Sequence, residues 1–193
     1  MAPLRLDFPV REAEVFPVLG AEDAFPTPYP DNGVTVLVPL SRWLEERLGL
    51  IDAGLSVGVW LASDESPEDW GPTLAEDMAR LPVIGLAFPA FTDGRAYSSA
   101  RLLRERHGFG GELRALGDVK IDQVPLMVRC GFDAIDPKDT LTEEAVNAAL
   151  SRFRHVYQHA GDGRPAIWAE RRSIVAKTEA ERCSTGIEKE IVA

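Results

Sequence analysis

The sequence predicts an α/β fold built around a parallel sheet, and two observations lead to this prediction. Short runs of consecutive apolar residues alternate with amphipathic helical patterns, roughly every 20–30 residues along the chain. The strand-like runs are apolar on both faces, which is typical of parallel strands covered by helices on both sides. About five βα units are recognisable, fewer than the eight of a closed barrel. The sequence therefore favours a partial, barrel-like (βα) sheet; the alternative is an open, flavodoxin-like sheet.

The chain begins with a proline-rich stretch, residues 1–33, which contains six prolines. Proline lacks an amide donor and disfavours helix in the residue before it. We therefore expect an extended arm with one short edge strand. Apolar side chains such as Phe8, Phe16 and Phe25 indicate that this arm lies on the body of the protein.

Residues 34–160 form the predicted α/β domain. Apolar runs predict strands at residues 34–38, 57–62, 83–88, 112–116 and 132–135. Helices are predicted at residues 41–49, 66–81, 98–107, 121–130 and 140–160. Several of these helices begin at a serine or threonine cap and end at a glycine. The last one is the longest, because Ala149, Phe153 and Val156 continue its apolar face.

Residues 161–193 form a C-terminal extension of different character. Trp168 is placed to dock against the body, whereas residues 177–193 are charged and lack a helical or strand period. We expect this last part to be a mobile tail.

The overall charge disfavours two classes of partner. The chain carries 31 acidic against 21 basic residues, a formal net charge of −10. Such a surface repels nucleic-acid phosphates and acidic lipids, so neither nucleic acid nor membrane is an expected partner. The two cysteines show no paired spacing, and we find neither a leader peptide nor an apolar run long enough to span a bilayer. These features favour a cytoplasmic protein.

Polar residues that follow two of the predicted strands mark the candidate site. In parallel α/β folds the working groups gather beyond the carboxyl ends of the strands. The loops after Phe88 and Leu116 face each other if their strands are neighbours. The candidate residues are Asp93, Gly94, Arg95, Tyr97, Ser98 and Ser99 after the first strand, Arg114 within the second, and Asp118, Asp122 and Gln123 after it.

The first loop suits a small anion. Gly94 permits close approach of the backbone, and the amides near Ser98 and Ser99 point outward at the predicted helix start, where the helix dipole favours negative charge. Arg95 can add a bidentate contact. The alternative is that Asp93 and Arg95 pair with each other while the serines cap the helix.

The same residues offer groups for proton transfer. Asp93 or Asp118 is the candidate general base, Tyr97 is a candidate donor, and Gln123 is an orienting group for the anion. Asp118 is equally well placed to cap the following helix.

Arg114 lies in ELRAL, where it points away from its apolar neighbours. An arginine inside a strand must be paired or reach a ligand, because burying it alone costs several kcal/mol. We consider an anion-binding role and a structural ion pair, with Asp93 and Asp118 as the expected protein partners.

No metal site is predicted, and no cofactor is assigned. Two carboxylates without a histidine, as at Asp118 and Asp122, are unspecific. His155 and His159 lack the glutamate that a zinc protease motif requires. The glycines of HGFGGE precede a strand, so they are no dinucleotide fingerprint.

At these residues the chain resembles a known family. The stretches DGRAYSSARLLRER, GELRALGDV and RCGFDA are similar to the core of the uncharacterised bacterial family called domain of unknown function 934, and the likeness covers roughly residues 34–160. Family members are loosely labelled oxidoreductases and are typically encoded beside sulfite or nitrite reductase. The resemblance therefore implies a role near sulfite reduction, but it brings no established catalytic residues.

Two interpretations follow, one an enzyme or binding site and one an accessory protein. In the first, the loops hold an oxyanion such as sulfite, sulfate or a phosphorylated metabolite. In the second, the protein is a non-catalytic partner of sulfite reductase that assists its assembly, stability or electron supply. Arg101, Arg104 and Arg106 are then the docking groups, with the acidic remainder steering the encounter.

Overall fold

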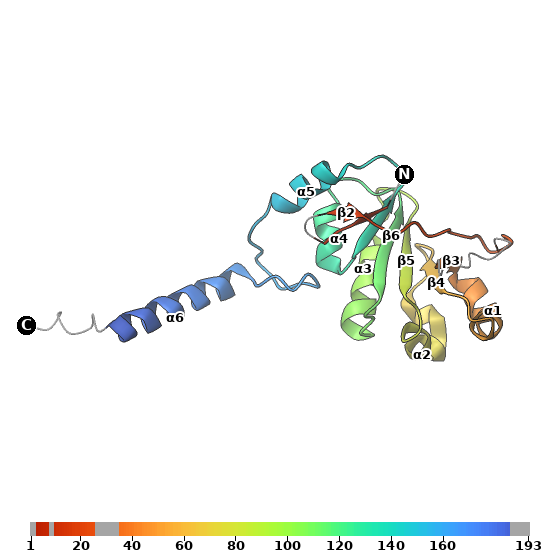
Figure 1. Cartoon of the computed structure of the whole chain (residues 1–193), viewed down its shortest axis with the longest axis horizontal. Coiled ribbons are helices and arrows are strands. Elements are labelled where there is room, and N and C mark those ends of the chain that lie inside the picture. The colour runs from red at the N-terminus through yellow and green to blue at the C-terminus, as the bar shows by residue number, and fades with distance from the viewer. Residues whose placement is uncertain (1–2, 8–9, 26–34, 186–193) are drawn as a thin grey trace, which may run out of the picture.

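The computed structural model describes residues 3–7, 10–25 and 35–185. It shows one open seven-stranded sheet in the order β2-β1-β7-β6-β5-β4-β3 (Figure 1). The α/β class is confirmed. The sheet is open, as in the flavodoxin-like alternative, and does not close into the barrel-like form that we favoured. Its strands are β1 (Leu4–Arg5), β2 (Arg11–Glu12), β3 (Val36–Pro39), β4 (Val57–Leu61), β5 (Val83–Phe88), β6 (Glu112–Gly117) and β7 (Ala134–Pro137).

The strands β3 to β7 pair in parallel and follow one another in chain order. All five predicted strand ranges overlap one of these strands. The arm adds β1 antiparallel to β7, and β2 antiparallel to β1. Because the parallel strands never reverse their order, they create no switch-point crevice of the kind that binds ligands in doubly wound folds.

The helices agree with the predicted ones less closely than the strands do. The 3₁₀ helix η1 precedes α2, and the π-helix η2 continues α3 without a break. The last predicted helix, residues 140–160, was too long: α5 ends at Ser151, and residues 152–166 form an irregular segment. The helices are α1 (Leu40–Asp52), η1 (Pro67–Thr73), α2 (Leu74–Met78), α3 (Arg95–Arg101), η2 (Leu102–Arg106), α4 (Val124–Cys130), α5 (Glu143–Ser151) and α6 (Ile167–Thr185).

The two faces of the sheet are covered differently. Alternate strand residues such as Ile84 and Leu113 join the helices in the main core. On the opposite face, Leu37 and Val83 pack with Phe16 of the arm. Strands that connect in chain order through right-handed crossovers place their helices on one face. The second apolar face, from which we inferred a second layer of helices, is therefore covered by the arm.

Hydrogen bonds fasten the arm to the sheet, including a parallel bridge between Val18 and Leu37 at the outer edge of β3. Leu37 donates its amide to the Pro17 carbonyl, and Leu19 donates its amide to the Leu37 carbonyl, both at 2.8 Å. The indole of Trp60 donates to the Leu19 carbonyl at 2.9 Å. Residues 10–25 of the predicted arm thus lie extended on the body; residues 1–2, 8–9 (including Phe8) and 26–33 lie outside the described part.

The C-terminal helix α6 extends away from the body (Figure 1). It includes residues 177–185, which we expected to belong to a mobile tail. Alanine, glutamate, lysine and arginine are frequent there and have high helix propensity, which explains a regular helix without an apolar period. Residues 186–193, the rest of the predicted tail, are outside the described residues.

A buried carboxylate joins the first helices. Asp77 is fully buried and accepts hydrogen bonds from the indoles of Trp43 at 3.0 Å and Trp70 at 2.9 Å. The Thr73 hydroxyl donates at 2.9 Å, and Arg47 forms an ion pair at 2.6 Å. Four donors around one charge offset its desolvation, so Asp77 links α1, η1 and α2.

Candidate functional site

The two predicted loops do lie side by side. The Phe91 amide donates to the Asp118 carboxylate at 2.9 Å, and the Gln123 side chain donates to the Phe91 carbonyl at 3.1 Å. The strands β5 and β6 are parallel neighbours in the sheet, so their carboxyl ends, at Phe88 and Leu116, lie at the same edge. The sequence therefore located a real edge of the molecule, shared by two loops.

The charges of the first loop are paired with each other. The Arg95 guanidinium donates to both carboxylate oxygens of Asp93, at 3.0 and 2.7 Å, and also to the Ser63 hydroxyl at 3.0 Å. These hydrogen bonds hold the pKa of Asp93 well below its usual range and raise the pKa of Arg95. A carboxylate held ionised in this way is a weak proton acceptor at neutral pH. The pair matches the structural alternative that we considered for this loop.

The Asp118 carboxylate of the second loop is likewise paired with a neighbouring cation. Lys120 forms ion pairs with Asp118 at 2.8 Å and with Asp139 at 2.5 Å. The pKa of Asp118 is lowered, first by Lys120 and then by the Phe91 amide. Gln123 accepts from the Lys120 amide at 3.0 Å, and Asp122 is exposed. Asp118 and Gln123 thus tie the loops together.

The helix after the first loop begins earlier than predicted. α3 starts at Arg95, with Gly94 as the residue before it, and the Asp93 carboxylate accepts from the Arg95 amide at 3.2 Å. Ser98 and Ser99 consequently lie in the second turn, where backbone amides bond within the helix. The outward-pointing amides belong to the residues around Arg95 instead of the two serines.

Tyr97 is a packed ring with an isolated hydroxyl. Its ring meets Phe88 edge-on with centroids 5.2 Å apart and Phe132 at 6.5 Å. The hydroxyl is buried and has no hydrogen-bond partner among the described residues. Burial, with smaller contributions from Cys130 and Asp122, raises the pKa of Tyr97 to about 12. Its hydroxyl therefore forms no hydrogen bond with the charged side chains of the two loops within the described residues.

Arg114 is not brought together with the loops. It lies within β6, in register with Gly85 and Ala134, on the face that the arm covers. The side chain is fully buried, and its Nε donates to Glu112 at 2.7 Å. The predicted partners Asp93 and Asp118 are replaced by Glu112 and the arm.

The arm completes the surroundings of Arg114. One guanidinium nitrogen donates to the Glu14 carbonyl at 2.6 Å, and the guanidinium carbon lies 4.1 Å from the Phe16 ring centroid. Burial raises the pKa of the nearby Asp136, and the charge of Arg114 opposes that rise. The environment of Arg114 is that of a structural ion pair, which was the second of our two alternatives.

The arginines of α3 and η2 have separate partners. Arg101 pairs with Glu105 at 2.6 Å and Arg106 with Glu68 at 2.5 Å, all exposed. Arg104 donates to the carbonyls of Phe109, Gly111 and Gly131 and forms an ion pair with Asp133. Arg104 thus connects η2 to the residues just before β7 and has a structural role. Of the three predicted docking arginines, Arg101 and Arg106 are the exposed ones.

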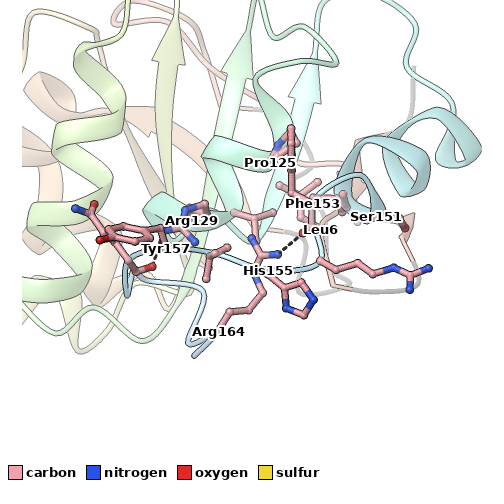
Figure 2. A pocket seen from close by; sticks show the side chains of 13 residues that line it. Leu6, Pro125, Arg129, Ser151, Phe153, His155, Tyr157 and Arg164 are labelled. Carbon is pink, nitrogen blue, oxygen red and sulfur yellow. Dashed lines mark hydrogen bonds between the residues drawn. The ribbon is translucent and has the colours of Figure 1, made fainter. Parts of the chain in front are cut away.

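An apolar hollow lies beside α4 and α5, at a place the sequence did not indicate. Its volume is about 850 Å³, and its outer side is formed by the 152–166 segment (Figure 2). Phe153 and Tyr157 are 64% and 79% exposed, so two aromatic rings face solvent at its border. The apolar lining residues are Leu6, Pro125, Val128 and Leu150 from the body, and Phe153, Val156 and Tyr157 from the segment.

The 152–166 segment is held to the body by Arg129. Its guanidinium donates to the Gln158 carbonyl at 2.8 Å and lies 3.4 Å from Asp162 (Figure 2 shows the first of these bonds). The Gly161 amide returns a bond to the Arg129 carbonyl at 2.9 Å. Arg164 pairs with the same Asp162 at 2.7 Å and donates to the Phe153 carbonyl at 3.1 Å. The hollow therefore has a fixed outer wall.

The sequence contained only a weak signal for this hollow. Phe153 and Val156 fit the helical spacing that Ala149 begins, so we assigned them to a helix face. The bonds that divert the chain come from Arg129, more than twenty residues earlier. A contact of that sequence separation leaves no local pattern.

The described residues contain neither a cluster of metal ligands nor a membrane-spanning helix. No group of three histidine, cysteine, aspartate or glutamate side chains in residues 3–7, 10–25 and 35–185 lies close enough to hold a metal ion. Within the same residues, no helix is both long and apolar enough to cross a membrane. Cys130 is free and buried, and burial raises the pKa of its thiol.

Comparison with known proteins identifies the family. No curated protein matches the chain. A family model described as a bacterial protein of unknown function, DUF934, matches residues 58–168, more than half of the chain. The matched part contains both loops, the Arg129 anchor and the segment that borders the hollow. The resemblance seen in the sequence is thereby confirmed, and the chain belongs to the bacterial family DUF934.

Proposed function

We propose that this protein is a non-catalytic accessory of assimilatory sulfite reduction that binds a partner protein, sulfite reductase, through the apolar hollow. The observation that carries the proposal is the pair of aromatic side chains, Phe153 and Tyr157, exposed at the border of that hollow. Contiguous exposed apolar surface on a folded domain marks an interaction site. The sulfite pathway comes from the resemblance described above.

The state of the loop edge also favours an accessory over an enzyme. Asp93 and Asp118, the candidate bases, are each held ionised by a neighbouring cation. Arg114, the candidate anion ligand, is buried under the arm. Tyr97 has no hydrogen bond to any of them among the described residues. Asp93, Asp118 and Arg114 are therefore each held in an ion pair, and the Tyr97 hydroxyl lies apart from them.

A growth experiment tests the proposal. In the organism that encodes this chain, we expect deletion of the gene to impair growth on sulfate and leave growth on cysteine intact. The wild-type gene restores growth on sulfate, whereas Phe153→Ser with Tyr157→Ser does not. Asp93→Asn is the matched control, because it alters the loop edge without touching the hollow. A deletion strain that grows equally on both sulfur sources would contradict the proposal.

A second candidate function, binding of a small oxyanion at the loop edge, is favoured by the start of α3. At this start the Arg95 amide and guanidinium both donate to the Asp93 carboxylate, and the side chain of Arg95 is 60% exposed. An oxyanion that replaced the Asp93 carboxylate would take over its bonds from both the guanidinium and the backbone amide of Arg95. Thermal unfolding with sulfite, sulfate and phosphate tests this proposal. Stabilisation that disappears in Arg95→Ala supports it, and an unchanged melting temperature contradicts it.

A further inference from the structure

The rim of the apolar hollow is more basic than the rest of the protein. The lining residues include Arg129, Arg154 and Arg164, and no aspartate or glutamate is among them. The chain as a whole carries a formal net charge of −10. A basic border around an apolar cavity is thus a local exception on an acidic protein.

The charge of this rim is only partly neutralised. Arg129 and Arg164 share one carboxylate, that of Asp162. His155 lies 2.9 Å from Glu170. Arg154 has no ion pair or hydrogen bond from its side chain among the residues that the structure describes. Two guanidinium charges therefore remain without a carboxylate of their own.

From this combination we infer that the hollow binds an acidic amphipathic segment of the partner protein, a stretch with apolar side chains bracketed by carboxylates. The inference rests on the proposed function, which it deepens by naming the chemistry of the partner. Apolar side chains would replace water against Phe153 and Tyr157, and carboxylates would meet Arg154 and the Arg129–Arg164 pair. Charge complementarity of this kind increases the association rate and selects among partners.

The geometry favours a continuous segment over a small ligand. Small-molecule sites bury most of their ligand, about 70–90% of its surface. Here Phe153 and Tyr157 remain 64% and 79% exposed at the border, so a compact ligand confined to the hollow would leave much of both rings in water. A polypeptide that passes along the border covers both rings and continues beyond them.

Charge also argues against a second copy of α6 as the occupant. That helix has four basic residues against three acidic ones, a net charge of +1. It would bring Arg171 and Arg172 toward the basic rim of the other copy. An acidic segment meets no such repulsion.

The wall of the hollow is preformed for such a segment. Arg129 donates to the Gln158 carbonyl and Arg164 to the Phe153 carbonyl, and the Gly161 amide donates to the Arg129 carbonyl. These bonds fix the backbone of the wall. A preorganised site pays less ordering entropy when it binds. We therefore expect measurable affinity for a short peptide without the remainder of the partner.

Two synthetic peptides test the inference with the full chain. Both are fluorescein-labelled and helical and share the same leucine and phenylalanine positions; one carries glutamate and the other lysine at the remaining exposed positions. Fluorescence anisotropy is recorded at low and high salt. We expect the glutamate peptide to bind, with an affinity that falls at high salt, and we expect the lysine peptide not to bind.

Variants locate the binding in the hollow. Phe153→Ser should lower the affinity for the glutamate peptide by about thirtyfold, as expected for truncation of an aromatic anchor. Arg154→Glu should weaken it by about tenfold. Arg152→Glu is the matched control: it makes the same charge change two residues away, at a position outside the lining, and should have much less effect. Because Phe153 and Arg154 are exposed, the melting temperature of each variant should stay near that of the wild type.

Four results would overturn the inference. They are equal binding of both peptides, no binding of either, equal losses in Arg152→Glu and Arg154→Glu, and a wild-type dimer in sedimentation that Phe153→Ser dissociates. The last result would assign the hollow to a second copy of the chain. If the peptide binds but the deletion strain grows normally on sulfate, the acidic partner is supported and the role in sulfite reduction is contradicted. The two proposals can therefore fail separately.

Discussion

Arg114 and Glu112, two residues apart on β6, form an ion pair that is closed to solvent on the arginine side. The Nε of Arg114 lies 2.7 Å from the carboxylate, and the Phe16 ring covers the guanidinium. A charge in this position is stabilised only while its partner is present. The arm, the sheet and this pair are consequently expected to behave as one unit in unfolding.

Loss of the arginine should therefore be costly to folding. Arg114→Ala leaves the Glu112 carboxylate with the more distant Arg5, 3.5 Å away, and creates a cavity below Phe16. We therefore expect a loss of about 3–5 kcal/mol in the free energy of unfolding. Arg114→Met in combination with Glu112→Gln fills the space without a charge and should cost much less. Urea denaturation measures both. A small loss in Arg114→Ala would mean that the pair contributes little to stability.

Asp77 is expected to be the second sensitive position. Replacement by alanine leaves Arg47 and the two indoles without their shared acceptor, and we expect a loss of about 3–5 kcal/mol. Glu76→Ala is the control, because Glu76 forms only an exposed ion pair with Arg80 and should cost less than about 0.5 kcal/mol. Tryptophan fluorescence follows unfolding in both. Equal losses at the two positions would contradict the role of Asp77.

Tyr97 gives a prediction for alkaline pH. Because its folded pKa of about 12 lies above the usual value of 10.0, folding favours the protonated phenol. This stabilisation is complete below pH 10 and is lost as the pH rises through 12, a change of about 1–2 kcal/mol after allowance for partial exposure. Tyr97→Phe should remove this pH dependence and be nearly neutral at pH 7, since its hydroxyl has no partner to lose. Loss of growth on sulfate in Tyr97→Phe would instead assign the hydroxyl a function.

Asp93 gives the corresponding prediction at acid pH. Arg95 keeps the Asp93 carboxyl ionised at pH 3.8, its ordinary midpoint. A lowered folded pKa means that the contribution to stability is present above that value and is lost as the pH falls below it. Carbon NMR titration should show Asp93 still charged at pH 3.8 in the wild type and protonated at a higher pH in Arg95→Ala, in which only the backbone amide and Ser63 still lower its pKa. A normal midpoint in the wild type would show that the pair does not persist in solution.

The strands of the sheet were predictable because each is encoded locally. Val83–Phe88 and Glu112–Gly117 are short apolar runs between turn residues, and their carboxyl ends marked the loop edge correctly. The covering of the sheet was not predictable in the same way. An apolar second face requires a cover, but the pattern does not state whether a helix or an extended arm provides it.

The side-chain partners escaped prediction for a related reason. Arg114 was expected to meet Asp93 or Asp118. It meets the Glu14 carbonyl because the arm returns over the sheet from the far end of the chain, and it meets Glu112 because residues two apart on a strand share a face. The apolar hollow depends in the same way on Arg129, which holds a segment that its own sequence marks as helical. Contacts between distant parts of the chain thus form the hollow and complete the surroundings of Arg114.

The most direct test of the central proposal is the affinity between the purified chain and purified sulfite reductase of the same organism, measured by isothermal titration calorimetry. We expect a saturable complex with the wild type and with Arg95→Ala, and its loss in Phe153→Ser with Tyr157→Ser. Absence of a complex with the wild type, or equal affinity in the double variant, would contradict a partner bound at the hollow.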